Sequence, residues 1–230
     1  MTKRYIMFKK KKIILIIVAV ALIAACFILM IKEKKPLQNN DSRTAVQTVK
    51  PIDAVDHIWG GQKAPVQMIV YSDFACPFCA QFAGTMKKIE ENFKDKVAIT
   101  FRHYPLPGHQ DAKRAAEAAE CAAEQGKFWE MHDKLFADNA AGRMSEEQFK
   151  QDAIDLSLDQ SQFDQCLGGG KYENKIKEQA AEGDKAGVTG TPTIFINNNI
   201  YPGAYPLEDF ISPDGREAKG MNSIISEMLK

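Results

Sequence analysis

The sequence predicts an α/β domain that carries a long helical insertion and follows one N-terminal transmembrane helix. Two apolar, strand-like stretches at 66–71 and 97–102 are separated by a helix-compatible stretch, a spacing typical of a β-α-β unit with parallel strands. Apolar residues recur at helical spacing through most of 109–186, which predicts an all-helical insertion. Residues 13–31 form one uninterrupted apolar run, which predicts the membrane segment.

The apolar run 13–31 is long enough to cross a bilayer. As a helix its 19 residues would span about 28 Å, close to the thickness of the hydrocarbon core. Six Lys or Arg residues precede the run, whereas three cations and one anion follow it. This bias predicts that the basic segment 1–12 is cytoplasmic and that the rest of the chain is extracytoplasmic.

Cys26 leaves a second interpretation of the apolar run open. Ile23-Ala24-Ala25-Cys26 has the small-residue pattern that precedes a lipid-modified cysteine, and 13–22 would fit a cleaved lipoprotein signal. The chain stays apolar through 27–31, which favours an uncleaved anchor. Both interpretations tether the domain outside the cytoplasm, at the cell membrane.

The charge distribution separates the first 35 residues from the rest. The chain has zero net charge, but residues 1–35 contain nine Lys or Arg and one Glu, which leaves −8 for the remainder. Phosphate binding needs a basic face. The acidic remainder therefore argues against nucleic acid as a partner.

The elements after the anchor follow in a simple order. Residues 32–50 are polar and without a period, which predicts a flexible linker. The α/β domain is predicted at 51–108 and 187–230, on both sides of the helical insertion. Its expected elements are an edge strand at 57–59, the strand 66–71, a helix at 80–93, the strand 97–102, strands at 193–196 and 200–201 around a turn, and a final helix at 219–229.

The insertion 109–186 shows several helix signals. Residues 110–125 are rich in alanine and favour a helix. Ser145 and Gln148 form a capping box before another apolar-periodic stretch. A glycine run at 168–170 separates this part from a last helix that is expected to end near Gly187.

Cys76-Pro77-Phe78-Cys79 lies between the strand 66–71 and the helix at 80–93. A thiolate at a helix N-terminus is stabilised by the helix dipole and by free backbone N–H groups, so Cys76 is predicted to be an exposed, reactive thiol with a lowered pKa. The spacing brings Cys79 within reach for a disulfide. On its own, the spacing also allows a structural zinc site or a pair of core cysteines.

Four cysteines remain once Cys26 is assigned to the membrane. An even number in an oxidising compartment indicates two disulfides, Cys76–Cys79 and, by elimination, Cys121–Cys166. The second bridge would stabilise the fold by roughly 3 to 4 kcal/mol in the chain-entropy picture. Two buried free thiols, or a second redox relay, are alternatives that the sequence leaves open for Cys121 and Cys166.

Three motifs together indicate a family. They are Ser72-Asp73-Phe74-Ala75-Cys76-Pro77-Phe78-Cys79, Glu120-Cys121-Ala122-Ala123 followed by Gly126-Lys127-Phe128-Trp129, and Val188-Thr189-Gly190-Thr191-Pro192-Thr193 before a β-hairpin. With these motifs in this order, residues 57–230 resemble the DsbA-like thiol:disulfide oxidoreductases. The resemblance implies a thioredoxin fold with a helical insertion, and a cis peptide bond before Pro192, beside the active-site sulfurs.

The resemblance also implies roles for the site residues. Cys76 is the sulfur that substrates attack, and Cys79 is the buried leaving or resolving sulfur. Pro77 and Phe78 tune the pair, and Thr191 with Pro192 supports an extended substrate segment. Two departures leave the direction of electron flow open: Phe78 stands where strongly oxidising relatives have His, and Val70 stands where many thioredoxin-fold enzymes have an acidic residue.

The function expected from these features is that of a membrane-anchored, extracytoplasmic thiol:disulfide oxidoreductase that introduces disulfides into exported proteins. A reductase or isomerase with the same site is the alternative. No cofactor is expected, and the expected partners are exported proteins with free thiols and a membrane redox partner that resets the pair. A non-enzymatic metal-binding (metallochaperone) module that uses Cys76 and Cys79 is a further alternative.

Overall fold

The computed structural model describes residues 48–230. The predicted membrane segment 13–31, the question of lipidation at Cys26 and most of the predicted linker lie outside the described residues. Within 48–230, no helix combines the length and apolar character needed to span a bilayer. Val49, close to the start of the described residues, is buried together with Ile69 and Tyr71 of the sheet.

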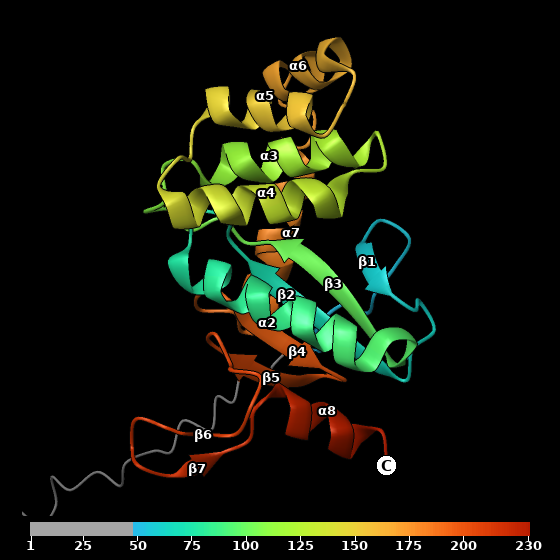
Figure 1. Cartoon of the computed structure of the whole chain (residues 1–230), viewed down its shortest axis with the longest axis vertical. Coiled ribbons are helices and arrows are strands. Elements are labelled where there is room, and N and C mark those ends of the chain that lie inside the picture. The colour runs from blue at the N-terminus through green and yellow to red at the C-terminus, as the bar shows by residue number, and fades with distance from the viewer. Residues whose placement is uncertain (1–47) are drawn as a thin grey trace, which may run out of the picture. The chain divides into compact units, whose positions relative to one another are not determined.

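A central sheet of five strands organises the described chain (Figure 1). The strands are β1 (His57–Gly60), β2 (Val66–Ser72), β3 (Val97–His103), β4 (Thr193–Ile196) and β5 (Asn199–Pro202), in the order β1-β3-β2-β4-β5. The pair β2 and β3 is parallel, and each other neighbouring pair is antiparallel. The predicted β-α-β unit is therefore present, with α2 (Pro77–Phe93) as its crossover.

Four helices of the predicted insertion stack above the sheet in Figure 1, and a fifth helix runs behind it. The stacked helices are α3 (Ala112–Ala123), α4 (Phe128–Ala141), α5 (Glu146–Asp155) and α6 (Gln160–Gly168), and the fifth is α7 (Glu173–Ala186). A 3₁₀ turn η1 (Lys94–Lys96), a small hairpin of β6 (Phe210–Ile211) and β7 (Glu217–Ala218), and α8 (Met221–Met228) complete the chain. The sequence did not predict the β6–β7 hairpin, because strands of two residues carry no readable period.

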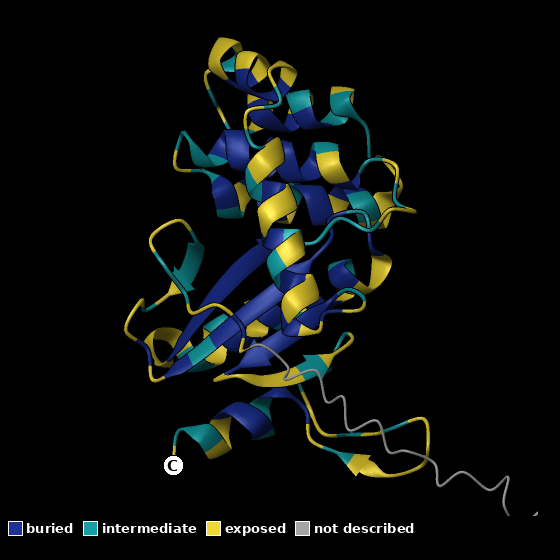
Figure 2. Ribbon diagram, turned by 180° about the vertical axis from the view of Figure 1, so that it is seen from behind, coloured by how far each residue is buried: buried dark blue, intermediate teal, exposed yellow. Residues whose placement is uncertain are grey.

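Apolar packing divides the core into three contiguous parts. One face of the sheet packs on α2 and α8 through residues such as Val70, Phe82 and Ile225. On another part of the sheet, Tyr71 packs beside the segment that ends α7. The third part joins the active-site loop to the helices α3 to α6. Figure 2 shows the buried ribbon continuing from the sheet into these helices, so the insertion shares its core with the site.

Candidate active site

The two sulfurs lie at the N-terminus of α2. Cys76 is the N-cap residue, and Pro77 is the first helical residue, so the helix begins three residues earlier than the sequence predicted. Proline is well suited to that first position because its missing N–H would have no intrahelical partner there. The short loop after β2 thus delivers Cys76 to the end of a helix dipole, as predicted.

The prediction that Cys76 is exposed is wrong. Its residue exposure is 3%, and that of Cys79 is 1%. The Cys76 thiol donates to the carbonyl oxygen of Thr191 at 3.4 Å, so the loop before β4 lies against the sulfur. The exposed residue of the motif is Phe78, at 62%. The helix N-terminus therefore offers substrates an aromatic side chain next to a shielded sulfur.

The surroundings of the two sulfurs give them opposite acidities. Hydrogen bonding from the Cys79 thiol, and then from the Thr191 side chain and the backbone N–H groups of Cys79 and Phe78, outweighs burial and lowers the pKa of Cys76 to about 5. Burial, followed by the neighbouring Cys76, raises the pKa of Cys79 far above its usual range. At neutral pH this difference favours a thiolate at Cys76, which then no longer donates to the Thr191 carbonyl oxygen, and a thiol at Cys79.

The four described cysteines form two different pairs. Cys121 of α3 and Cys166 of α6 are bridged, with an S–S distance of 2.04 Å and a Cα–Cα distance of 5.8 Å, as predicted. Cys76 and Cys79 are free thiols in this structure. The structure thus shows the reduced state of the pair for which the sequence predicted a disulfide.

The loop before β4 is placed as the sequence predicted. The peptide bond between Thr191 and Pro192 is cis, and Pro192 is buried. The Thr191 carbonyl oxygen reaches the Cys76 sulfur. The structure therefore brings together Cys76, Cys79, Thr191 and Pro192 from segments about 115 residues apart.

Asp73 lies against the buried sulfur through its backbone. Its N–H donates to the Cys79 Sγ at 3.5 Å, while its buried carboxylate accepts from the His109 Nδ1 at 2.6 Å and from the Leu106 N–H at 2.9 Å. Val70, where an acidic residue is common, is fully buried in the apolar core beneath α2. The carboxylate of Asp73 thus holds the loop after β3 onto the active-site loop.

Asn139, which the sequence did not indicate, contacts the site from the helical insertion. Its side-chain amide donates to the carbonyl oxygens of Phe74 at 2.8 Å and of Cys76 at 3.0 Å. These contacts join residues more than 60 positions apart. No local pattern marks such a pair, because an asparagine near a helix end is an ordinary solvent-facing residue in most sequences.

The histidines are engaged by acidic side chains. His57 and His103 both contact the Glu120 carboxylate at 2.9 to 3.0 Å, and Lys175 contacts it at 2.8 Å. Although burial opposes the change, the two histidines lower the pKa of Glu120. Among residues 48–230, no cluster of three or more His, Cys, Asp or Glu side chains is arranged to hold a metal.

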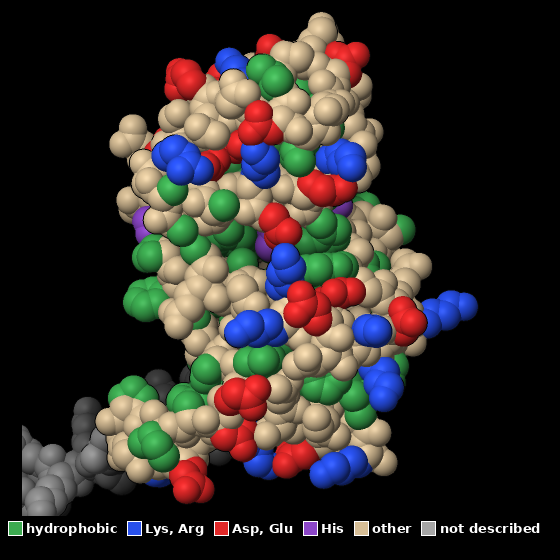
Figure 3. All heavy atoms as spheres, in the orientation of Figure 1, with side chains coloured by type: hydrophobic (Ala, Val, Ile, Leu, Met, Phe, Trp, Pro, Cys, Tyr) green, Lys and Arg blue, Asp and Glu red, His purple; other side chains and the backbone are tan. Residues whose placement is uncertain are grey.

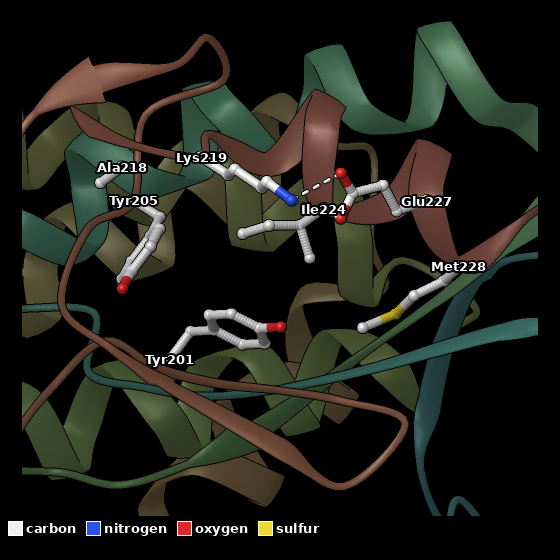
Figure 4. Close-up of a pocket in the computed structure, with 7 residues that line it drawn as sticks. All are labelled: Tyr201, Tyr205, Ala218, Lys219, Ile224, Glu227 and Met228. Atoms are coloured by element: carbon white, nitrogen blue, oxygen red, sulfur yellow. Dashed lines mark hydrogen bonds and ion pairs between the residues drawn. The ribbon is translucent and has the colours of Figure 1, made fainter.

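A surface pocket of the described residues lies away from the sulfurs. The pocket in Figure 4, about 470 Å³, is lined by residues of β5, β7 and α8 and the loops between them, and the ion pair of Lys219 and Glu227 at 2.6 Å borders it. On the face drawn in Figure 3, acidic and basic side chains alternate with small apolar groups. The residues that line this pocket do not include Cys76 or Cys79, so the candidate site is identified by its sulfurs.

The fold and the dithiol define a thioredoxin-fold protein with the active-site arrangement of the DsbA-like thiol:disulfide oxidoreductases. The profile of the Thioredoxin_4 family, described as thioredoxin, matches residues 53–212. The chain therefore belongs to the Thioredoxin_4 family.

Solved structures share this fold. BdbD from Bacillus subtilis superposes with a TM-score of 0.59 at 20% identity, over 76% of this chain and 92% of BdbD. The corresponding values for α-DsbA1 from Wolbachia pipientis are 0.61 at 23% identity, over 80% and 94% of the two chains. DsbA2 from Pseudomonas aeruginosa gives 0.53 at 26% identity, over 75% and 88%.

Curated relatives match through a part of their length only. The Na(+)/H(+) antiporter NhaA 3 of Salinispora tropica is 36% identical over 169 residues, which are 73% of this chain but 26% of the antiporter. NhaA 1 of Mycolicibacterium gilvum is 32% identical over 170 residues, or 72% of this chain and 27% of that protein. The names of these relatives therefore describe proteins about four times as long as the matched part.

Proposed function

We propose that this protein is a membrane-anchored, extracytoplasmic thiol:disulfide oxidoreductase that introduces disulfides into exported proteins. The observation that carries the proposal is the opposite acidity of the two sulfurs at the start of α2. The environment of Cys76 lowers its pKa to about 5, whereas burial raises that of Cys79. A stabilised thiolate stabilises the reduced pair, which makes the disulfide a stronger oxidant.

The reaction follows from this asymmetry. A substrate thiolate attacks the Cys76 sulfur of the oxidised pair, the Cys76–Cys79 bond breaks, and the Cys79 sulfur leaves and takes a proton. A second substrate thiolate then attacks the substrate sulfur of the mixed disulfide, and Cys76 leaves as the stabilised thiolate. The substrate loses two electrons and the pair gains two. The exposed Phe78 offers an apolar contact beside the reacting sulfur.

A second reaction must return the pair to its disulfide. We infer that a membrane redox partner accepts the two electrons, because the anchor predicted at 13–31 would hold the domain at the membrane surface. The Cys121–Cys166 bridge supports an oxidising compartment, since such bridges are rare where thiols are kept reduced. Protease treatment of intact cells tests this placement: digestion of the domain is expected, and full protection contradicts it.

The reduction potential of the Cys76–Cys79 pair tests the direction of electron flow. Equilibration of the full chain with glutathione buffers, followed by alkylation of free thiols, gives the potential directly. We expect a value well above that of thioredoxin, which is about −270 mV. A value near or below that of thioredoxin would falsify the oxidase proposal and favour a reductase. Efficient reshuffling of a wrongly bridged substrate, with little net oxidation, would instead favour an isomerase.

A further inference from the structure

Asn139 connects the helical insertion to the peptide groups that carry the reactive sulfur. It lies in the last turn of α4 and is half-buried. Its amide donates one hydrogen to the Phe74 carbonyl oxygen at 2.8 Å and another to the Cys76 carbonyl oxygen at 3.0 Å. Both hydrogens of the side chain are therefore used on the active-site loop, one on each side of Ala75.

The Cys76 carbonyl is also the first acceptor of α2. It accepts from the N–H groups of Cys79 and Ala80, each at 3.1 Å. No side chain caps this helix, and Pro77 has no N–H to contribute. Asn139 is thus a contact from outside the helix that holds the peptide group from which the helix starts.

The orientation of the first turn matters for the thiolate. The N–H groups of Phe78 and Cys79 stabilise the negative charge on the Cys76 sulfur. Their effect on the sulfur depends on the direction of the peptide groups at the start of α2, where the Cys79 N–H also donates to the Cys76 carbonyl oxygen. The hydrogen bond from Asn139 to the Cys76 carbonyl oxygen keeps this turn from rotating or fraying, which end residues of helices otherwise do.

We propose that Asn139 is a positioning residue for Cys76, and that through it the helical insertion sets the reactivity of the active-site thiol. Asn139 acts on the sulfur through the backbone of residues 74–79 and not by touching it. The inference rests on the proposed function, because it treats Cys76 as the reacting sulfur. It adds a reason for the insertion: α4 supplies an anchor that a bare thioredoxin sheet and α2 do not contain.

The test is a thiolate titration of the reduced, full-length chain, followed by its absorbance at 240 nm without any substrate. In Asn139→Ala both donors are lost, and in Asn139→Asp a carboxylate faces two carbonyl oxygens. We expect both to raise the titration midpoint by roughly one pH unit, and to lower the equilibrium constant for oxidation of glutathione by up to about tenfold. Asn139→Gln keeps a donor on a longer arm and should shift the midpoint less.

Asn174→Ala is the matched control, because Asn174 is an exposed asparagine of α7 in the same insertion. It should leave the midpoint unchanged. A folded Asn139→Ala or Asn139→Asp protein with the wild-type midpoint overturns the proposal, even if its melting temperature has fallen, since Asn139 would then be a structural contact only. If neither variant folds, Asn139→Ser, whose single hydroxyl cannot replace both amide donors, is titrated and judged by the same criterion.

The titration is independent of turnover, so failures of the two proposals are distinguishable. A raised midpoint in the Asn139 variants, in a protein that does not oxidise reduced substrates, keeps the positioning role and contradicts the proposed function. Normal oxidase activity together with an unchanged midpoint in the variants keeps the proposed function and contradicts the positioning role of Asn139.

Discussion

Two pairs of cysteines share one hydrophobic core in this protein and differ in their chemistry. Cys76, Cys79, Cys121 and Cys166 all belong to the core that joins the active-site loop to α3–α6, and their exposures lie between 1% and 7%. One pair is reduced and the other is bridged. Burial therefore does not distinguish the redox-active pair from the structural pair.

The backbone around each pair does distinguish them. Cys76 sits at a helix N-terminus, where backbone N–H groups and a neighbouring thiol stabilise a thiolate. Cys166 lies in the last turns of α6, and a carboxylate oxygen of Glu124 is 3.3 Å from its sulfur. A nearby negative charge disfavours a thiolate, so Cys166 lacks the thiolate stabilisation that Cys76 has. The two pairs therefore differ in the groups around their sulfurs: a thiol and backbone N–H groups beside Cys76, and a carboxylate beside Cys166.

The largest effect is expected from replacing the reactive sulfur. Cys76→Ser removes the atom that substrates attack, and serine cannot form the mixed disulfide. We expect turnover of a reduced two-thiol peptide to fall to background, measured by the loss of its free thiols. The control is the double variant Cys121→Ser/Cys166→Ser, assayed at a temperature where it is folded. Turnover retained by Cys76→Ser, or lost equally in the double variant, would contradict the division of roles between the pairs.

The same double variant is expected to show the next largest effect, on stability. Removing a bridge between residues 45 positions apart frees the unfolded chain and should lower the free energy of unfolding by roughly 3 to 4 kcal/mol in the chain-entropy picture. Urea unfolding, followed by circular dichroism, measures the change. The counterpart experiment measures the free energy of unfolding after the Cys76–Cys79 disulfide is reduced while Cys121–Cys166 stays intact. A larger loss of unfolding free energy on reducing Cys76–Cys79 would mean that this pair, and not Cys121–Cys166, is the structural one.

The sequence predicted much of this difference between the two pairs, because the spacing and number of the cysteines are visible in the sequence. The spacing of Cys76 and Cys79 after an apolar strand predicted a dithiol at a helix start, and the β2–α2–β3 unit confirmed it. The even cysteine count predicted the second bridge. The burial of Cys76 was missed, because the loop carrying Thr191 covers it from a distant part of the chain. Asn139 was missed for the same reason, since long-range hydrogen bonds leave no period.

The stability of the insertion and the reactivity of the dithiol are expected to depend on pH through different groups. Asp152 of α5 and Asp138 of α4 are both buried, and burial together with Asp138 raises the pKa of Asp152 to about 6. A raised folded-state pKa favours the neutral carboxyl, so this group's contribution to stability is present below about pH 4 and is lost as pH rises through about 6. Lys134 and Gln148 contact Asp152, and Arg143 contacts Asp138, so the loss is partial.

Asp152→Asn should remove that dependence, because its amide has no proton to lose. We expect the free energy of unfolding of the wild type, relative to Asp152→Asn, to fall by up to about 3 kcal/mol between pH 4 and 7. The pH profile of Cys76 alkylation should be unchanged in the variant, since that profile follows the thiolate. A shifted alkylation profile would show that the insertion and the dithiol titrate as one unit.

The smallest effect, on the reduction potential, is expected from replacing Phe78, one of the two residues between Cys76 and Cys79. Phe78 is 62% exposed, so replacing it costs little packing, but its ring cannot donate a hydrogen bond to the Cys76 thiolate. An imidazole at this position can donate one, and a hydrogen bond to a charged group contributes about 1.5 to 3 kcal/mol. We take half to all of the lower of these energies as stabilisation of the Cys76 thiolate. Because 30 mV corresponds to about 1.4 kcal/mol for two electrons, Phe78→His should raise the reduction potential by about 15 to 30 mV. Phe78→Ala, which removes the ring without adding a donor, is the control and should stay near the wild-type potential. An equal rise in both variants would mean that loss of the aromatic ring, rather than a new donor, tunes the pair.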